Sequence, residues 1–226
     1  MENAGNGNFM ARRMRQSCVK AEIRTRIPMT FDIFPALAGF AAASLFTPGP
    51  NNLMLVASGA NFGIRRTLPH LSGVVLGFPL MIVPVGLGAM RLFDLWPPAY
   101  AVLKTLAVVY LLYLAWKIAT AGEVREAAAE TRPMTFAQAA AFQWVNPKGW
   151  SMALGAITLY APGRDVAGVL FVASVFLALG TVSGIVWTSF GTGIRRWLAN
   201  PVRLRWFNRT MAALLVAAMV PVLFGG

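Results

Sequence analysis

Long apolar stretches separated by short polar or basic segments make up most of the chain after residue 31. We place six of them, at about 32–59, 69–90, 99–119, 137–160, 166–190 and 208–225. Each is close to the ~20 residues that a helix needs to cross the hydrocarbon core of a bilayer. Trp and Tyr residues lie near their ends, as in the aromatic belts of membrane proteins. The pattern therefore predicts an all-α membrane protein with about six transmembrane helices.

The composition supports lipid as the main solvent of this chain. Of the 226 residues, 57% are hydrophobic and 12% are charged, whereas a soluble domain has roughly 25% charged residues. The net charge is +12, and the Lys and Arg residues lie in short clusters between the apolar stretches. That distribution is typical of loops that face anionic lipid and cytosol. We therefore expect membrane lipid, and not nucleic acid, as a partner.

Cysteine and histidine are scarce. Cys18 is the only cysteine and lies outside every apolar stretch, so no disulfide forms within the chain. His70 is the only histidine, and we expect it at the edge between a loop and the membrane. With so few soft ligands, the sequence predicts no metal site. We also expect no cofactor and no enzymatic activity.

Residues 1–28 differ from the rest of the chain. They are polar and basic and lack the apolar core of a secretory signal. They are either a disordered tail or untranslated sequence, and we favour the second interpretation because Met29 leads directly into the first apolar stretch. Residues 29–226 would then form a single transmembrane domain.

Charge in the loops predicts the orientation. The first, third and fifth loops together hold ten basic residues, and the second and fourth hold two. Because basic loops stay in the cytoplasm, both ends of the transmembrane domain should lie outside. The six basic residues of the tail would lie on the wrong side, which also favours a start at Met29.

Two of the six stretches are interrupted. The first contains FTPGPNN (46–52) and the fourth contains VNPKG (145–149). Proline prevents a continuous helix, and freed backbone groups are tolerated within a membrane only where they line a cavity or are buried in protein. Thr47-Pro48 and Asn146-Pro147 each put a capping residue before a proline, so each predicts a new helix start. The positive end of each half-helix, with Lys148 beside one of them, would suit a carboxylate ligand.

The two breaks are 99 residues apart, and the same shift aligns the second stretch with the fifth and roughly the third with the sixth. Two repeats of three helices have opposite topology, and broken helices in such inverted repeats mark the midplane site of a transporter. A pair of kinks in a structural bundle is the alternative. We select ten substrate-binding candidates: Thr47, Pro48, Gly49, Pro50, Asn51, Asn52, Gln143, Asn146, Pro147 and Lys148. Small-residue spacing at Gly73, Gly77, Gly86, Gly88, Gly180 and Gly184 instead favours close helix packing.

Four runs carry a resemblance to a known family. TPGPNN (47–52), GANFGIRRTLPH (59–70), YLLYLAWK (110–117) and QWVNPKGW (143–150) resemble the lysine exporter (LysE/RhtB) superfamily, and the resemblance covers about residues 29–225. It implies a multi-pass secondary transporter of a bacterial inner membrane that exports amino acids or their derivatives, driven by proton or electrical gradients. The chain looks most like the branch that exports neutral amino acids of the threonine/homoserine and cysteine/O-acetylserine types.

The distribution of acidic residues limits which substrates and coupling mechanisms the chain could use. No Asp or Glu lies inside a predicted span, and residues 77–80 read GFPL where the branch for basic amino acids has an acidic residue. This disfavours a cationic substrate and a simple carboxylate proton relay. The sequence does not identify the exact amino acid or the coupling ion. It also does not decide whether the protein forms a homodimer. Exporters of a metal ion or membrane thiol-disulfide carriers would need ligands or cysteines that the spans lack, and a non-transporting scaffold would not need two matched breaks.

Overall fold

The computed structural model describes residues 33–89, 95–96, 98–121, 132–161, 163, 165–218 and 220. The tail 1–28 lies outside the described residues, as does Met29, the suggested start of translation. The chain divides into two units, Met1–Gly39 and Phe40–Gly226. The described part of the first unit is helical, and all contacts given below belong to the second.

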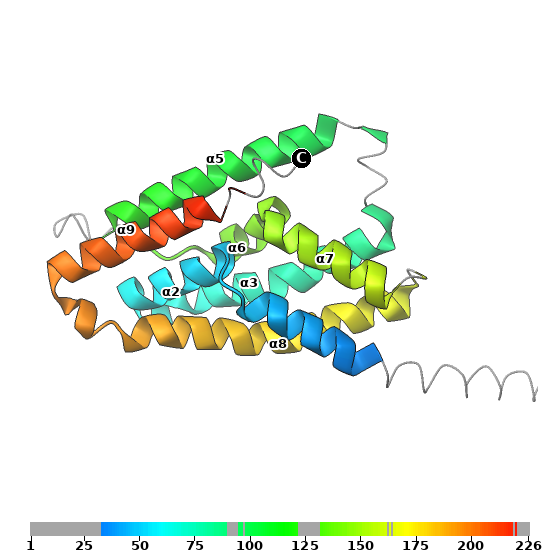
Figure 1. Ribbon diagram of the computed structural model, residues 1–226, viewed down its shortest axis with the longest axis horizontal. Helices are drawn as coiled ribbons and strands as arrows, with labels where there is room; N and C mark the ends of the chain where they lie inside the picture. The colour runs from blue at the N-terminus through cyan, green and yellow to red at the C-terminus, as the bar shows by residue number, and fades with distance from the viewer. Residues whose placement is uncertain are drawn as a thin grey trace, which may run out of the picture. The chain divides into compact units, whose positions relative to one another are not determined.

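Every regular element in the described ranges is helical (Figure 1). The elements are helix Ile33–Phe46, α2 (Pro50–Phe62), α3 (Ile64–Pro84), the π-helical turn η1 (Val85–Ala89), α5 (Pro98–Thr120), α6 (Phe136–Phe142), the 3-10 turn η3 (Gln143–Val145), α7 (Pro147–Tyr160), α8 (Val166–Gly193), the 3-10 turn η4 (Trp197–Ala199) and α9 (Pro201–Ala217). This confirms the predicted all-α class.

Three described helices are long and apolar enough to cross a membrane: Ile64–Gly88, Ala101–Thr120 and Val166–Gly193. Helix Ile33–Phe46 and α2 make a fourth candidate span, which is bent by 54° at the break between them. The predicted interruption of the first stretch is therefore present.

The exact start of α2 differs from the prediction. Gly49 is the N-cap and Pro50 the first helical residue, so the predicted start at Thr47-Pro48 is wrong. The Thr47 hydroxyl instead donates to the carbonyl of Ala43, at 2.5 Å, and belongs to the end of the preceding helix. In the fourth stretch the prediction is confirmed, because Asn146 is the N-cap and Pro147 the first residue of α7.

Helix α3 begins at Ile64, five residues before the predicted stretch. Gly63, with φ 77°, ends α2 and lets the next helix start at once, a conformation that glycine adopts without steric cost. Arg65 and Arg66 consequently lie in the first turn of α3, where we had expected a loop.

Helix α9 begins at Pro201, seven residues before the predicted stretch. The Asn200 side chain accepts hydrogen bonds from the N–H groups of Val202, at 2.8 Å, and Arg203, at 3.3 Å. An Asn cap followed by proline is a strong helix start. It outweighs the polar residues that follow, so the helix extends beyond its apolar part.

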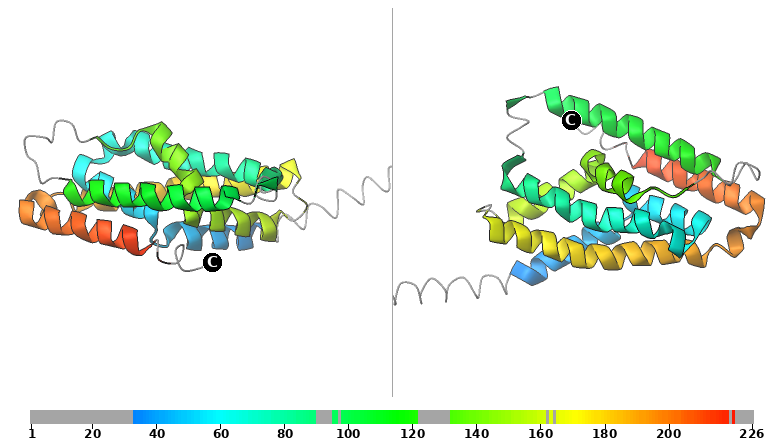
Figure 2. Two further views of the ribbon diagram at one scale, coloured as in Figure 1. Left: turned by 90° about the horizontal axis from the view of Figure 1, so that it is seen from above. Right: turned by 180° about the vertical axis from the view of Figure 1, so that it is seen from behind.

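Helix packing brings α2 and α3 against α8, α6 against α3, and α5 against α9 (Figures 1 and 2). A Cβ at Gly77 would lie 2.6 Å from the Cα of Ala140 on α6. The predicted role of small residues in packing is confirmed at Gly73, Gly77, Gly86 and Gly184. It is wrong at Gly88 and Gly180, where an added Cβ would meet no atom of the described residues within 4 Å.

A buried cluster joins four of these helices. It consists of Met54, Leu111, Leu114, Ala115, Phe142, Ala212 and Leu215, from α2, α5, α6 and α9. Outside this cluster α5 exposes large apolar side chains, such as Leu106 at 55% and Trp116 at 63%. Exposed apolar surface of this kind suits a helix that faces lipid.

Candidate binding site at the two helix breaks

The two breaks meet in the structure. The Lys148 ammonium group donates to the carbonyl of Thr47, 2.6 Å away. The amides of Asn51 and Gln143 exchange two hydrogen bonds, Asn51 Nδ2 to Gln143 Oε1 at 2.8 Å and Gln143 Nε2 to Asn51 Oδ1 at 3.3 Å. A Cβ at Gly49 would lie 2.7 Å from Cδ of Lys148, so a larger residue would force that side chain to shift. The sequence correctly paired two segments about a hundred residues apart.

A cavity of about 40 Å³ lies at this junction. Five of the ten predicted candidates line it: Gly49, Asn51, Asn52, Asn146 and Lys148. The others shape the junction without lining it, namely Thr47, Pro48, Pro50, Gln143 and Pro147. Thr47 and Gln143 act through the hydrogen bonds just described, and the prolines start or interrupt helices.

Several polar groups in the cavity wall already have partners. Asn52 Nδ2 donates to the carbonyls of Leu45, at 2.8 Å, and Thr47, at 2.9 Å. Ser183 of α8 donates to the same Leu45 carbonyl at 2.9 Å. These bonds satisfy the carbonyl end of the helix before the break and fix α2 and α8 to it. Lys148 uses one of its three N–H donors on Thr47, so two donors remain with respect to the residues that the structure describes.

Asn146 stands apart from these residues. Its side chain is 2% exposed, and Oδ1 has no hydrogen-bond partner among the described residues. It does not cap α7, although it occupies the N-cap position. Leaving a buried acceptor unpaired costs about 1–3 kcal/mol. A ligand with a donor group would remove that cost.

Positive potential converges on the cavity. Helices α2 and α7 both begin there, and neither has a side-chain cap on its first N–H groups. Helix N-termini favour anions, and Lys148 adds a full charge. None of the described lining residues carries a carboxylate. The cavity therefore suits a small molecule with an anionic group and a separate hydrogen-bond donor.

Apolar side chains form the rest of the wall, and sequence reasoning missed them. Phe78 of α3 and Phe176 of α8 line the cavity with their rings edge to face, centroids 5.3 Å apart. Met152 of α7 lies in the same wall. The only signal in the sequence that α8 approaches the breaks is the small-residue spacing of Gly180 and Gly184. That spacing predicts helix packing and not a binding site.

His70 is also placed differently from the prediction. It is the seventh residue of α3 and is 2% exposed, so it is a buried helical residue and not part of a loop. Among the described residues, no group of three or more His, Cys, Asp or Glu side chains lies together as metal ligands would.

The fold and this cavity define a helical membrane protein with a polar site at broken helices. The LysE type translocator family matches residues 42–225. The chain therefore belongs to the LysE-type translocator family, which confirms that it is a membrane translocator and not an enzyme.

The chain is similar to several cysteine/O-acetylserine efflux proteins. It is 28% identical over 198 residues to the cysteine/O-acetylserine efflux proteins of Escherichia coli strain K12 and Shigella sonnei strain Ss046. The match covers 87% of this chain and 100% of each relative. A cysteine/O-acetylserine efflux protein of Escherichia coli O1:K1 is similar to the same extent. No solved structure shows a significant match.

Proposed function

We propose that this protein is a secondary transporter that exports small neutral amino acids or their derivatives across a bacterial inner membrane. The observation that carries the proposal is the junction cavity, where Lys148, two uncapped helix N-termini and the unpaired Oδ1 of Asn146 lie together. The efflux function named for the curated relatives supports the same direction of transport.

The proposed architecture has six spans in two inverted three-helix repeats. The first and fourth spans are broken, and the breaks share one cavity. In such an arrangement α3 corresponds to α8 and α5 to α9, and both pairs pack together. Binding at the interface of two inverted repeats near the midplane is how several transporter folds alternate access.

We assign the two charged groups of an amino acid to different polar groups of the cavity wall. The carboxylate binds Lys148 Nζ and the first N–H groups of α2 and α7. The ammonium group donates to Asn146 Oδ1. Lys148 keeps its hydrogen bond to Thr47 when the site is empty, so release of the substrate does not leave the lysine without a partner.

The apolar wall and the lack of acidic groups favour a neutral, small side chain. Phe78, Met152 and Phe176 leave limited space beside the polar groups. A cationic side chain would find no carboxylate among the described lining residues. Cysteine, O-acetylserine and threonine fit these conditions, and the first two are named for the curated relatives.

Replacing Lys148 by Met tests the proposal, because Met keeps the length and removes the charge. A hydrogen bond to a charged group contributes about 1.5–3 kcal/mol, so we expect export to fall at least about tenfold. The measurement is efflux of L-cysteine, kept reduced, and of O-acetyl-L-serine from loaded liposomes that contain the purified protein.

The matched control is Lys104→Met, which removes a lysine of α5 that does not line the cavity. Lys104→Met should export like the parent, and both variants should accumulate in the membrane. If Lys148→Met exports as well as the parent, the proposed carboxylate site is wrong. If the parent itself releases neither compound nor threonine, the protein is not an exporter of this class.

A further inference from the structure

A second cavity, of about 80 Å³, lies along α2 beyond the junction cavity. Residues of α2 that recur at helical spacing line it: Met54, Ala57, Ser58, Asn61 and Phe62. Its other walls come from α3, the end of α5 and residues 132–134, which precede α6. The space is sufficient for several water molecules or a small solute.

Two of its polar side chains are already satisfied. Ser58 shares a hydrogen bond of 3.0 Å with Thr67. Asn61 donates to Ala57 at 2.8 Å and to Asn208 Oδ1 at 3.0 Å. These groups therefore need no further ligand.

His70 is not satisfied. It lines this cavity, is 2% exposed, and neither ring nitrogen has a partner among the described residues. A neutral imidazole has one donor and one acceptor, and burying both without partners is destabilising. The junction cavity does not contain this residue, so the transport site proposed above gives it no role.

Two cations complete the lining. Lys117, at the end of α5, lies 5.7 Å from the ring centroid of Tyr113, and Arg132 precedes α6. No carboxylate is found among the described lining residues. Asp165, the one acidic residue in the described ranges, is used to cap α8 through the N–H of Gly168. Both cations are exposed, so an anionic group that enters the cavity can reach them.

We propose that this cavity is a second binding site for the transported amino acid, which it occupies before it reaches the junction cavity. The carboxylate binds Lys117 and Arg132, and the ammonium group donates to the acceptor nitrogen of His70. The apolar side chains of Met54, Leu114 and Met134 contact the substrate side chain. This inference rests on the proposed function.

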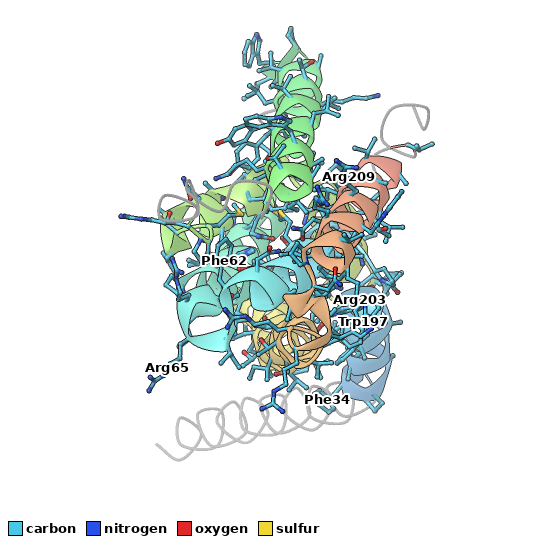
Figure 3. The ribbon with its side chains drawn as sticks, turned by 90° about the vertical axis from the view of Figure 1, so that its left-hand side faces the viewer. Phe34, Phe62, Arg65, Trp197, Arg203 and Arg209 are labelled. Atoms are coloured by element: carbon cyan, nitrogen blue, oxygen red, sulfur yellow. The ribbon has the colours of Figure 1, made fainter. Side chains whose placement is uncertain are left out.

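The position of the cavity fits a loading site. Its α2 residues extend to Phe62, at the end of the helix, whereas those of the junction cavity lie near its start. That end of α2 adjoins the basic start of α3 (Figure 3, where Phe62 and Arg65 are labelled). In the orientation predicted from loop charge, the end of α2 faces the cytoplasm. An exported amino acid enters the transporter from that side.

Binding stoichiometry tests the inference. The full-length protein in nanodiscs is titrated with radiolabelled L-cysteine under reducing conditions. We expect two sites per chain in the parent, and one in each of His70→Phe and Lys148→Met. The combined variant should bind none. In liposomes His70→Phe should raise the half-saturating concentration at least tenfold and change the maximal rate less than twofold, because the junction cavity is intact.

His70→Gln separates ligand binding from packing, because it keeps a donor and an acceptor. It should retain the second site, at lower affinity, where His70→Phe loses it. If His70→Phe does not accumulate, the Lys117→Met and Arg132→Gln double variant replaces it and should also leave one site.

One site in the parent that only Lys148→Met removes would overturn the inference while leaving the proposed function intact. A parent that binds no L-cysteine and releases none would overturn both. Two sites in the parent that survive His70→Phe would show that the second amino acid binds elsewhere.

Discussion

Asn146 and Asn200 start helices in the same sequence context but use their side chains differently. Each is the N-cap of a helix whose first residue is proline. Asn200 accepts two backbone hydrogen bonds, as a capping residue normally does. Asn146 makes no such bond, and its oxygen lies unpaired in the wall of the junction cavity. The Asn-Pro pattern predicts a capped helix start at both positions. At Asn146 the side chain instead offers an acceptor to the cavity.

This contrast gives a matched pair of substitutions. Asn200→Ala should lower the free energy of unfolding by about 1 kcal/mol, because a cap is lost, and should leave substrate affinity unchanged. Asn146→Ala should weaken amino-acid binding by about tenfold or more, since a hydrogen bond to an ammonium group is lost. Its stability should not fall, because the removed oxygen has no partner in the empty site.

Thermal unfolding of the purified protein and equilibrium binding of L-cysteine measure the two effects. A stability loss at Asn146→Ala with normal affinity would mean that the side chain is structural.

At the scale of the helices, the sequence located both breaks but not every helix boundary. Prolines and glycines mark interruptions by local chemistry, so 46–52 and 145–149 could be found from the chain alone. The apolar pattern alone places the start of α9 too late, because the polar residues that follow the Asn-Pro cap still belong to the helix. The start of α3 depended on the φ angle of Gly63, which sequence does not reveal.

The contact between α2 and α8 gives a second matched pair. A Cβ at Gly191 would lie 2.9 Å from the backbone carbonyl carbon of Val56. A Cβ at Gly193, on the same helix, would meet nothing within 4 Å in the described part of the chain. We expect Gly191→Ala to destabilise the protein by about 1–3 kcal/mol through overpacking. Gly193→Ala should be neutral or slightly stabilising, because alanine restricts the unfolded chain.

The readout for this pair is the amount of folded protein in the membrane together with the temperature of unfolding in detergent. Equal stability of the two variants would show that α2 and α8 do not approach as closely as the structure places them.

At the scale of the whole molecule, the site needed information that local patterns do not hold. The sequence paired the breaks by their 99-residue separation. It gave no position for Phe78 or Phe176, because an apolar residue facing a cavity and one facing lipid look alike in a buried helix. His70 was missed for a related reason, since the predicted start of its span placed it at a boundary.

The arrangement of charge argues for one orientation. Helices α5 and α8 end at the same end of the second unit, where α3 and α9 begin (Figure 1). The basic residues at these termini include Arg65, Lys117, Arg195 and Arg203, and Figure 3 views this end. Clusters of this kind remain on the cytoplasmic side. Helix α9 begins there and leads away, so its last residue, Ala217, should lie nearer the outside than its first, Pro201.

A reporter fused after Gly226 tests this orientation in cells. Alkaline phosphatase, which is active only outside the cytoplasm, should be active in that position, and a cytoplasmic fluorescent reporter should be dark. Reporters placed between Arg195 and Arg203 should give the opposite pattern, because that segment joins α8 and α9 at the basic end.

Exchanging Arg195, Arg196 and Arg203 for Gln should weaken the preference for this orientation, since positive charge near helix ends sets it. A cytoplasmic signal after Gly226 would reverse the orientation, and the second cavity would then open to the outside and be unable to load substrate for export.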